Sequence, residues 1–346
     1  MNNTKSSPAF DPDAPAAVGS LFGLPFTTGN AKIVTLPIPW DATVSYRTGA
    51  AKGPKAILNA SCQVDLFDEH ISNAWKIGIA MDTYPEEVEK NNSALRKKAA
   101  QYIDAFVNGK AETKSMKAIR DDVNKKCDEL RKWIKQRSLT FLKKNKIVAL
   151  IGGDHSTPLG LMQAVSQQYN SFGILHIDAH CDLRNAYEGF TYSHASIMFN
   201  ALKIKNMEKL VQVGIRDFSD GEKKVIDDSK GRIRLFSDKS MKEKMYEGYT
   251  WQQITSNIVE QLPKNIYISF DIDGLDPKLC PNTGTPVPGG LEFQQALYLI
   301  EQVVEAGKKI ISFDINEVAP GTDEWDANVG ARLLYKVSNL AALSQV

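Results

Sequence analysis

The chain has 346 residues, and its 42 basic and 41 acidic side chains give a formal net charge of +1. This balance argues against a protein that binds nucleic acid through bulk positive charge. It also argues against an acidic disordered chain. The length suits one large α/β domain or two smaller domains with a sizeable core.

Cysteine usage and the lack of targeting signals favour a reducing compartment. The 4 cysteines, at positions 62, 127, 181 and 280, form no CxxC pair, which excludes a zinc ribbon and a thioredoxin-like motif. Residues 1–30 contain no apolar stretch typical of a secretory signal, and no apolar run approaches ~18 residues. We therefore expect a cytoplasmic protein with no membrane partner and no nucleic-acid partner.

Residues 1–30 are rich in proline, alanine, glycine and serine, so we expect an N-terminal arm. From residue 31 to 346, short apolar runs alternate with helical patterns in what reads as a single domain. The runs expected to be strands are Ile33–Ile38, Trp75–Ala80, Ile147–Ile151, Gly173–Ile177, Leu210–Gly214, Ile233–Phe236, Ile266–Phe270 and Ile310–Phe313. The helical patterns include Pro54–Asp65, Pro158–Gln168, Leu291–Glu305 and Asn328–Leu343. Continuously apolar strands suit a parallel sheet covered on both faces, which predicts an α/β fold of three αβα layers with eight mostly parallel strands.

One charged segment, residues 86–145, breaks this alternation. It lacks proline and carries charge runs such as Arg96–Lys98 and Lys143–Lys144. Its composition predicts a long helix pair inserted between the second and third strands, forming a solvated outer layer. A contact between subunits and a lid over the site are the alternatives.

Three motifs rich in aspartate and histidine each follow directly on an expected strand. They are Gly152–Ser156 (GGDHS), Asp178–Asp182 (DAHCD) and Asp271–Pro277 (DIDGLDP). Ligands gather at the carboxyl ends of parallel strands, so the three motifs should meet in one crevice. Each motif alone could be a turn or a helix cap, but their joint occurrence after strands makes that interpretation poor.

The spacing within these motifs predicts a metal centre. Alternate side chains of an extended segment point to the same face. This rule groups Asp178, His180, Asp182, Asp271 and Asp273, to which the first motif adds His155. Converging carboxylates would repel one another, and two divalent cations would neutralise them. Two such ions about 3.5–4 Å apart can share a hydroxide nucleophile. Carboxylates and imidazoles without a thiolate favour manganese-like ions over a structural zinc.

At these residues the chain resembles the ureohydrolase family, which includes arginases, agmatinases, guanidinobutyrases, formiminoglutamases and guanidine hydrolases. The resemblance covers about 31–82 and 146–345. It also rests on Pro39–Ile57, Ser269–Pro277, Gly284–Gly290 (GTPVPGG) and Asp314–Pro320 (DINEVAP). It implies an arginase-like fold and a binuclear hydrolase that cleaves a guanidino C–N bond and releases urea. It further implies a homo-oligomer, a homotrimer or homohexamer.

The resemblance also implies a ligand set for two divalent ions, Mn²⁺ with Ni²⁺ as the alternative. One ion would be held by His155, Asp178, Asp182 and Asp271. The other would be held by Asp178, His180, Asp271 and Asp273, so that Asp178 and Asp271 bridge.

The same resemblance suggests residues on the substrate side. Glu317 would orient the guanidinium, since a planar cation pairs well with a carboxylate. His194 and Asp273 are candidate proton carriers, and Ser219 and Trp325 are expected near the substrate. By strand alternation His176 lies on the ligand side, and we expect it to support the ligands or the core.

The substrate remains open between several guanidines. Asp182–Gly189 resembles the agmatinase form of its loop, and Ser219 stands where arginase-like enzymes place an aspartate. Both features favour agmatine or a similar guanidine without a carboxylate. The arm, the insertion and Glu324–Arg332 are similar to a divergent branch with guanidine hydrolases, so free guanidinium is the alternative, with Trp325 narrowing the pocket. Arginine, guanidino acids and formiminoglutamate are further alternatives.

Overall fold

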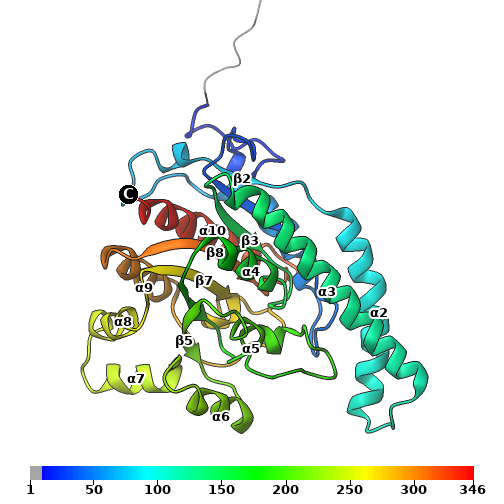
Figure 1. The fold of residues 1–346 in the computed structure, drawn as a ribbon. Coiled ribbons are helices and arrows are strands. Elements are labelled where there is room, and N and C mark those ends of the chain that lie inside the picture. Colours follow the sequence, from blue (N-terminus) through cyan, green and yellow to red (C-terminus); the bar gives the residue numbers. More distant parts are fainter. Residues whose placement is uncertain (1–9) are drawn as a thin grey trace, which may run out of the picture.

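Eight strands form a single sheet in which every neighbouring pair runs parallel (Figure 1). The structure, a computed structural model, describes residues 10–346, so residues 1–9 of the expected arm lie outside the described range. Across the sheet the strand order is β2-β1-β3-β8-β7-β4-β5-β6. The strands are β1 (Ile33–Pro37), β2 (Ile79–Met81), β3 (Ile147–Ile151), β4 (Phe172–Ile177), β5 (Met207–Ile215), β6 (Ile233–Ser237), β7 (Asn265–Asp271) and β8 (Lys309–Asn316). The expected α/β fold with an eight-stranded sheet is confirmed.

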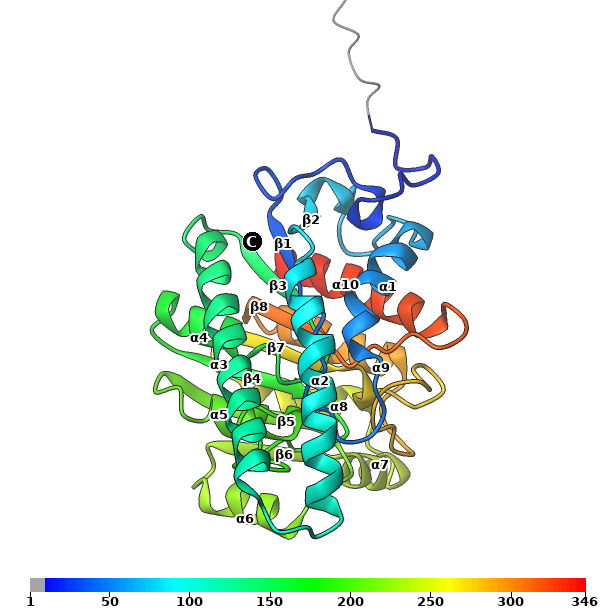
Figure 2. The same ribbon diagram turned by 90° about the vertical axis from the view of Figure 1, so that its right-hand side faces the viewer.

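Helices cover both faces of this sheet (Figures 1 and 2). One face carries α1 (Gly53–Ala60), α8 (Trp251–Glu260), α9 (Phe293–Glu305) and α10 (Trp325–Leu343). The other face carries α3 (Lys114–Leu142), α4 (Leu159–Gln168) and α5 (Ile197–Ala201), with α2 (Glu86–Val107) packed on α3. Two further helices, α6 (Asp220–Asp228) and α7 (Asp238–Tyr246), follow β5 and β6. No helix within residues 10–346 combines the length and the apolar character needed to cross a bilayer.

Two hydrophobic cores lie on opposite sides of the sheet because successive strand residues point to opposite faces. In β3, Ile147, Ala149 and Ile151 pack into the core beneath α9 and α10. The intervening Val148 and Leu150 pack into the core beneath α3 and α4. This double burial explains why the strand is apolar at every position.

The second expected strand, Trp75–Ala80, is shorter than its apolar pattern suggests. Residues 74–77 form a 3₁₀ turn, and β2 begins only at Ile79. Gly78 separates the two with a φ of +78°, and a Cβ there would lie 2.9 Å from the ring of Phe26. A side chain at this position would therefore be both strained and crowded, so the chain turns at the glycine before it enters the sheet.

The charged range 86–145 holds α2 and α3, which run side by side as a long antiparallel pair in both views (Figures 1 and 2). Their buried residues recur at helical spacing, as in Val123, Cys127, Leu130 and Ile134 of α3. This narrow apolar stripe packs towards α4, and charged residues cover the rest of the surface. Thr113 caps α3, because its hydroxyl accepts a hydrogen bond from the Met116 amide at 3.2 Å.

The topology places four adjacent strands, β3, β8, β7 and β4, at the centre of the sheet. Their carboxyl ends lead directly into the GGDHS motif, Glu317, the Asp271–Asp273 segment and the DAHCD motif. Residues far apart in the sequence therefore meet at one edge, as the sequence predicts.

Asp68 lies in the loop before β2 and connects this loop to α10 through hydrogen bonds. Its buried carboxylate accepts hydrogen bonds from Asn339 Nδ2 at 3.0 Å, Lys336 Nζ at 3.1 Å and the His70 amide at 3.0 Å. Burial would raise the pKa of Asp68, but these bonds lower it below its ordinary value. The stabilisation is therefore present at neutral pH and is lost as the pH falls through the lowered pKa.

We predict that Asp68→Ala lowers the free energy of unfolding by about 1–3 kcal/mol, because it leaves buried donors without an acceptor. Denaturant unfolding at pH 7 measures this change. Asp65→Ala is the matched control, since Asp65 is exposed on the same segment. Equal stabilities for the two variants would contradict the prediction.

Candidate metal centre and active site

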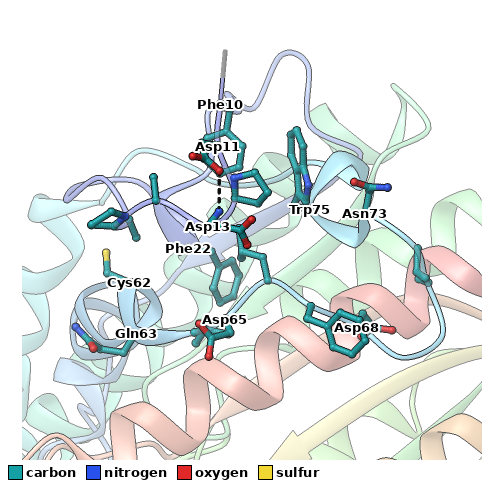
Figure 3. Close-up of a pocket in the computed structure, with 18 of the residues that line it drawn as sticks. Phe10, Asp11, Asp13, Phe22, Cys62, Gln63, Asp65, Asp68, Asn73 and Trp75 are labelled. Atoms are coloured by element: carbon teal, nitrogen blue, oxygen red, sulfur yellow. Dashed lines mark hydrogen bonds between the residues drawn. The ribbon is translucent and has the colours of Figure 1, made fainter. Parts of the chain in front are cut away.

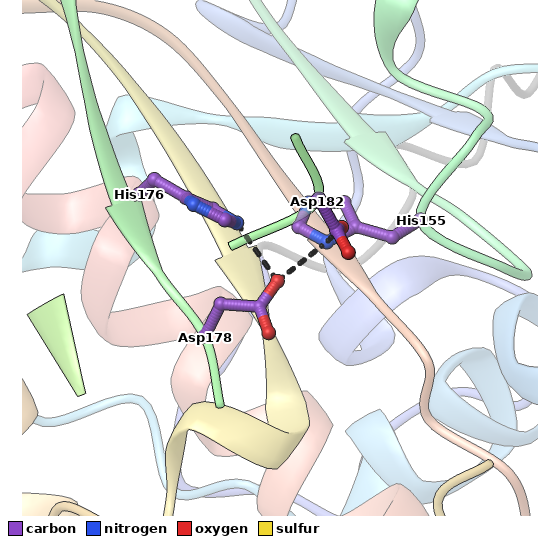
Figure 4. Close-up of side chains that lie close together, drawn as sticks. All are labelled: His155, His176, Asp178 and Asp182. Atoms are coloured by element: carbon purple, nitrogen blue, oxygen red, sulfur yellow. Dashed lines mark hydrogen bonds and ion pairs between the residues drawn. The ribbon is translucent and has the colours of Figure 1, made fainter. Parts of the chain in front are cut away.

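Two groups of histidine and aspartate side chains lie at the carboxyl edge of the sheet, and Figure 4 shows the first of them. The first contains His155, His176, Asp178 and Asp182, and the second contains Asp178, His180 and Asp273. Within each group the potential ligand atoms all lie within 4.8 Å of one another. Asp178 belongs to both groups, so the two groups adjoin.

Three carboxylates surround Nδ1 of His155: two belong to the first group, and the third is that of Asp271, which belongs to neither group. This nitrogen lies 3.0 Å from Asp178 Oδ2, 3.4 Å from Asp182 Oδ2 and 3.2 Å from Asp271 Oδ2. Ligand atoms bound about 2.1 Å from a common octahedral ion lie roughly 3 Å from their neighbours. The spacing of these four atoms therefore suits one divalent cation.

The second group surrounds Nδ1 of His180, which lies 3.2 Å from Asp273 Oδ2 and 3.5 Å from Asp178 Oδ1. Asp178 thus turns one oxygen towards His155 and the other towards His180, the arrangement of a bridging carboxylate. Asp271 directs Oδ2 towards His155, while its Oδ1 accepts a hydrogen bond from the Asp273 amide at 2.9 Å.

A hydrogen-bond chain orients the ring of His155. The Ser269 hydroxyl donates to Asp314 Oδ1 at 3.0 Å, so its oxygen accepts from His155 Nε2, 2.9 Å away. The proton on Nε2 leaves the lone pair of Nδ1 available for a cation. Outer hydrogen bonds of this kind fix the orientation of a ligating histidine.

His176 supports the centre in a similar way. The Gln212 amide donates to the carbonyl of Cys181 at 2.8 Å and to His176 Nδ1 at 3.0 Å. His176 Nε2 therefore carries the proton and donates it to Asp178 Oδ2 at 2.8 Å, as Figure 4 shows. Burial lowers the pKa of His176, which keeps the ring neutral in this role.

The electrostatics of the two groups suit added positive charge. Burial, reinforced by Asp178, raises the pKa of Asp182 to about 7. Burial also raises the pKa of Asp271 well above its ordinary value, with Asp273 and Asp178 adding to the effect. Although burial lowers it, the pKa of His155 is raised well above 6.5 by the surrounding carboxylates. The donor set of carboxylate oxygens and imidazole nitrogens, without sulfur, fits two divalent cations.

Two residues of the centre have left-handed backbone, Asp182 with φ +53° and Glu317 with φ +62°. Such conformations cost roughly 1–3 kcal/mol each at non-glycine residues and persist where the surroundings enforce them. Glu317 is held through its amide, which donates to the Gly153 carbonyl at 2.8 Å. Its Oε1 accepts a hydrogen bond from the His155 amide at 2.9 Å. The GGDHS motif therefore positions both a metal ligand and this glutamate.

A cavity of about 420 Å³ adjoins the two groups of histidine and aspartate side chains, which are called the metal groups below. His180, Asp182 and His194 contribute to its inner lining. Its walls include Tyr46, Arg47, Arg184, Tyr187, Asp217, Phe218, Glu222 and Thr285. Glu317 faces a narrow adjoining recess that shares Tyr46, Arg47, His194 and Thr285 with the cavity.

The structure brings Glu317 and His194 to this cavity and leaves two other expected residues outside its lining. Ser219 caps α6, and its hydroxyl donates to Glu222 Oε2 at 2.8 Å. Trp325 is half-exposed at the start of α10, and its indole donates to the Lys278 carbonyl at 3.0 Å. Neither lines the cavity or the recess.

The sequence motifs do not indicate that Tyr46, Tyr187 and Asp217 line the cavity. They lie in loops that follow β1, β4 and β5, and this position after a strand end was the available signal. Which side chains of such a loop reach the cavity depends on how the loop folds back over the strand ends.

A larger cavity of about 870 Å³ lies between residues 10–16 and residues 62–75 (Figure 3). Its lining includes Asp11, Asp13, Asp65 and Asp68 but no member of either metal group. It contains no histidine and lies at the arm, away from the carboxyl edge that carries the metal groups. We therefore assign the active site to the smaller cavity.

The chain belongs to the arginase family: residues 31–338 match the family model described as "Arginase family". It is accordingly a hydrolase of amidine C–N bonds, a ureohydrolase of guanidino compounds.

The chain is 34% identical over 313 residues to an N(1)-aminopropylagmatine ureohydrolase of Thermus thermophilus, covering 90% of this chain and 91% of that protein. The fold is similar to that of an agmatine ureohydrolase of Thermoplasma volcanium, with a TM-score of 0.70, 22% identity and coverage of 94% and 95% of the two chains. It is also similar to a proclavaminate amidino hydrolase of Streptomyces clavuligerus, with a TM-score of 0.71, 23% identity and coverage of 95% and 99%.

We predict that Asp178→Ala removes both metal ions, because this side chain faces both histidines. Metal content per chain, measured by mass spectrometry after reconstitution, should fall from two ions to none, and activity should fall to that of the metal-free protein. Asp276→Ala is the control, since Asp276 belongs to the DIDGLDP motif but to neither metal group. Two retained ions with full turnover would refute the bridging role.

We also predict that metal affinity weakens as the pH falls below about 7, the raised pKa of Asp182. A carboxyl group must lose its proton before it can bind an ion, so a lower pH favours the protonated, metal-free form. Calorimetric titration in buffers of different ionisation heat should detect proton release on metal binding at neutral pH. Equal affinity on both sides of pH 7, without proton release, would contradict this linkage.

Proposed function

We propose that this enzyme hydrolyses a guanidine that has a cationic tail and no carboxylate, such as agmatine, to urea and the corresponding amine. The observation that carries the proposal is the position of Glu317, which accepts a hydrogen bond from the His155 amide and faces a recess that adjoins the 420 Å³ cavity. The cavity is large enough for a guanidinium head with an alkyl chain, and Glu317 lies in the recess that shares Tyr46, Arg47 and His194 with it.

Glu317 is the residue proposed to bind the guanidinium. Burial raises the pKa of Glu317 well above its ordinary value, and Asp154 raises it further. A bound guanidinium would supply the positive charge that favours the ionised carboxylate. The His155 amide holds one oxygen, so the side chain is oriented before the substrate arrives.

His194 is proposed to move protons. Burial lowers the pKa of His194 to about 4, helped by His180 and His155, so the ring is neutral at pH 7. A neutral imidazole has one free nitrogen and one N–H, so it can accept one proton and deliver another to the leaving amine. The edge of the Tyr187 ring lies against the imidazole, with ring centroids 6.1 Å apart.

The metal groups provide the rest of the chemistry. When bound, two divalent ions supply a hydroxide nucleophile at neutral pH and charge that stabilises the transition state. We propose Mn²⁺ because oxygen ligands predominate, with Ni²⁺ as the alternative to be tested. The residues proposed to hold the ions are His155, Asp178, His180, Asp182, Asp271 and Asp273.

The walls of the cavity support a substrate with a cationic tail. Asp217 is exposed on the lining and lies beside His180 through a backbone bridge. The two cations of the walls already have contacts: Arg184 lies 3.8 Å from Glu222, and Arg47 donates to the Pro281 carbonyl. An ammonium therefore suits these walls better than a carboxylate, which disfavours arginine and guanidino acids.

Free guanidinium is a weaker candidate. The arm, the insertion and Glu324–Arg332 favoured this alternative, but one part of it, the narrowing of the pocket by Trp325, is not supported because that side chain does not line the cavity. A bare guanidinium would leave most of the cavity to water. Several relatives carry names of enzymes for guanidines with long tails, N(1)-aminopropylagmatine ureohydrolase and agmatinase.

Urea release tests the proposal. Purified enzyme reconstituted with Mn²⁺ or Ni²⁺ would be offered agmatine, N(1)-aminopropylagmatine, arginine, 4-guanidinobutyrate and guanidinium. We expect the two guanidines with cationic tails to give the highest kcat/KM. Turnover of guanidinium alone, or of a carboxylate-bearing guanidine alone, would refute the proposed substrate class.

We predict that Glu317→Gln lowers kcat/KM about 10- to 100-fold, the usual value of one hydrogen bond to a charged group. The amide still accepts from His155 but lacks the charge that pairs with guanidinium. Metal content should stay at two ions. Glu324→Gln, an exposed change near the start of α10, should have no effect. Unchanged kinetics in Glu317→Gln would remove this residue from substrate binding.

The assembly expected from the sequence, a homotrimer or homohexamer, stays part of this proposal. Light scattering coupled to size-exclusion chromatography would test it.

A further inference from the structure

Helices α2 and α3 contact two of the loops that line the active-site cavity. One loop, residues 41–51, carries Tyr46 and Arg47 and is called the first wall. The other, residues 184–194, carries Tyr187 and His194 and is called the second wall. All four of these side chains line the cavity.

Helix α2 contacts the first wall through a reciprocal pair of hydrogen bonds. The Asp41 amide donates to Asn92 Oδ1 at 2.8 Å, and Asn92 Nδ2 donates to Asp41 Oδ1 at 2.9 Å. Both side chains are buried. The other oxygen of Asp41 accepts from the Gly49 amide at 3.0 Å and the Ala51 amide at 3.4 Å. Asn92 therefore fixes the carboxylate that closes this loop upon itself.

Helix α3 contacts the second wall through Asn124. Its Nδ2 donates to the Gly189 carbonyl at 3.1 Å, and its Oδ1 accepts from the Thr191 amide at 2.8 Å. One amide side chain thus pairs with the backbone on both sides of Phe190, as a neighbouring strand would. The approach is close, because a Cβ on Gly189 would lie 2.8 Å from the hydroxyl of Tyr102 in α2.

Other contacts strengthen both attachments. Arg96 of α2 donates to the Ala42 carbonyl at 3.4 Å in the first wall. The ring of Tyr102 packs on Phe190 of the second wall, with centroids 5.5 Å apart. The same two helices therefore contact both walls, although neither helix lines the cavity.

We propose that the α2–α3 pair sets the substrate range of the enzyme by fixing the separation of the two walls, with Asn92 and Asn124 as positioning residues. This inference rests on the proposed function. The guanidinium head meets Glu317, the metal groups and the parts of the walls that line the recess, whereas a long tail extends along the remainder of both walls. Loss of a contact that holds a wall should therefore weaken binding of the tail more than binding of the head.

The test compares Asn92→Ala and Asn124→Ala with Asn91→Ala in the metal-loaded enzyme. Asn91 neighbours Asn92 but is exposed and makes no hydrogen bond to either wall within residues 10–346. We expect KM for agmatine to rise about tenfold in the first two variants, the usual equivalent of a lost buried hydrogen bond. The inhibition constant of guanidinium, which contacts only the parts of the walls at the recess, should rise less than KM for agmatine, and metal content should stay unchanged.

Asn124→Ala should also lower kcat, because His194 ends the second wall. Equal changes in the agmatine and guanidinium constants would overturn the inference, since they would mean a general loss of structure. So would kinetics indistinguishable from Asn91→Ala.

A swapped pair tests Asn92 further. Asn92→Asp alone places two carboxylates face to face and should impair agmatine binding more than Asn92→Ala. Adding Asp41→Asn restores an amide opposite a carboxylate, with every donor and acceptor of the original pair, and should recover most of the affinity. Failure of the double variant to improve on the single one would contradict the role of this contact.

Hydrogen exchange separates this inference from the proposed function. In Asn124→Ala, exchange should accelerate in residues 184–194 and remain unchanged in the central strands. If the wild-type enzyme releases no urea from any guanidine, the proposed function fails, yet the exchange pattern still tests the attachment. Unchanged exchange in the second wall would overturn the attachment whatever the substrate.

Discussion

The arrangement of this enzyme depends on the convergence of buried carboxylates that cannot all remain charged without a counter-ion. Asp178, Asp182 and Asp271 surround one imidazole nitrogen at 3.0–3.4 Å, where water cannot screen them. Burial raises the pKa of two of these carboxyl groups and so favours retained protons or bound cations. The parallel sheet makes the convergence possible, because the ligands follow the ends of neighbouring central strands. A mixed sheet would send some of these ends to the opposite edge.

Buried hydrogen bonds orient the side chains of the candidate metal centre. The Gln212 amide sets the proton of His176, which in turn orients the shared carboxylate of Asp178. The hydroxyl of Ser269 does the same for His155, through Asp314. These side chains lie in the strands, whose backbone is fixed by the sheet on both sides. The positions of the candidate ligands therefore depend on rigid strands, while loops contribute most of the cavity lining.

The α2–α3 pair changes how the charged region of the chain should be understood. Composition alone suggests a solvated outer layer, and most of the surface of these helices fits that description. A few polar side chains on the inner face form the exception, since Asn92 and Asn124 satisfy backbone groups of the two walls. Surface loops are otherwise mobile. We propose that attachment to two long helices fixes the position of both walls beside the candidate active site.

The fold class and a set of candidate metal ligands could both be predicted from the sequence, because both have local signatures. Buried parallel strands are apolar at every position, and ligands at strand ends recur at alternate residues or beside a glycine pair. The side chains that support the candidate centre, and those that line the cavity, become apparent only in the three-dimensional structure. His176 and Gln212 are 36 residues apart, Asn124 and Gly189 are 65 apart, and Asp41 and Asn92 are 51 apart. Trp325 and Ser219 show the converse, since the resemblance suggested them near the substrate but neither lines the cavity or the recess. Hydrogen bonds between distant segments leave no periodic pattern in a sequence, because each depends on how two backbones approach in space.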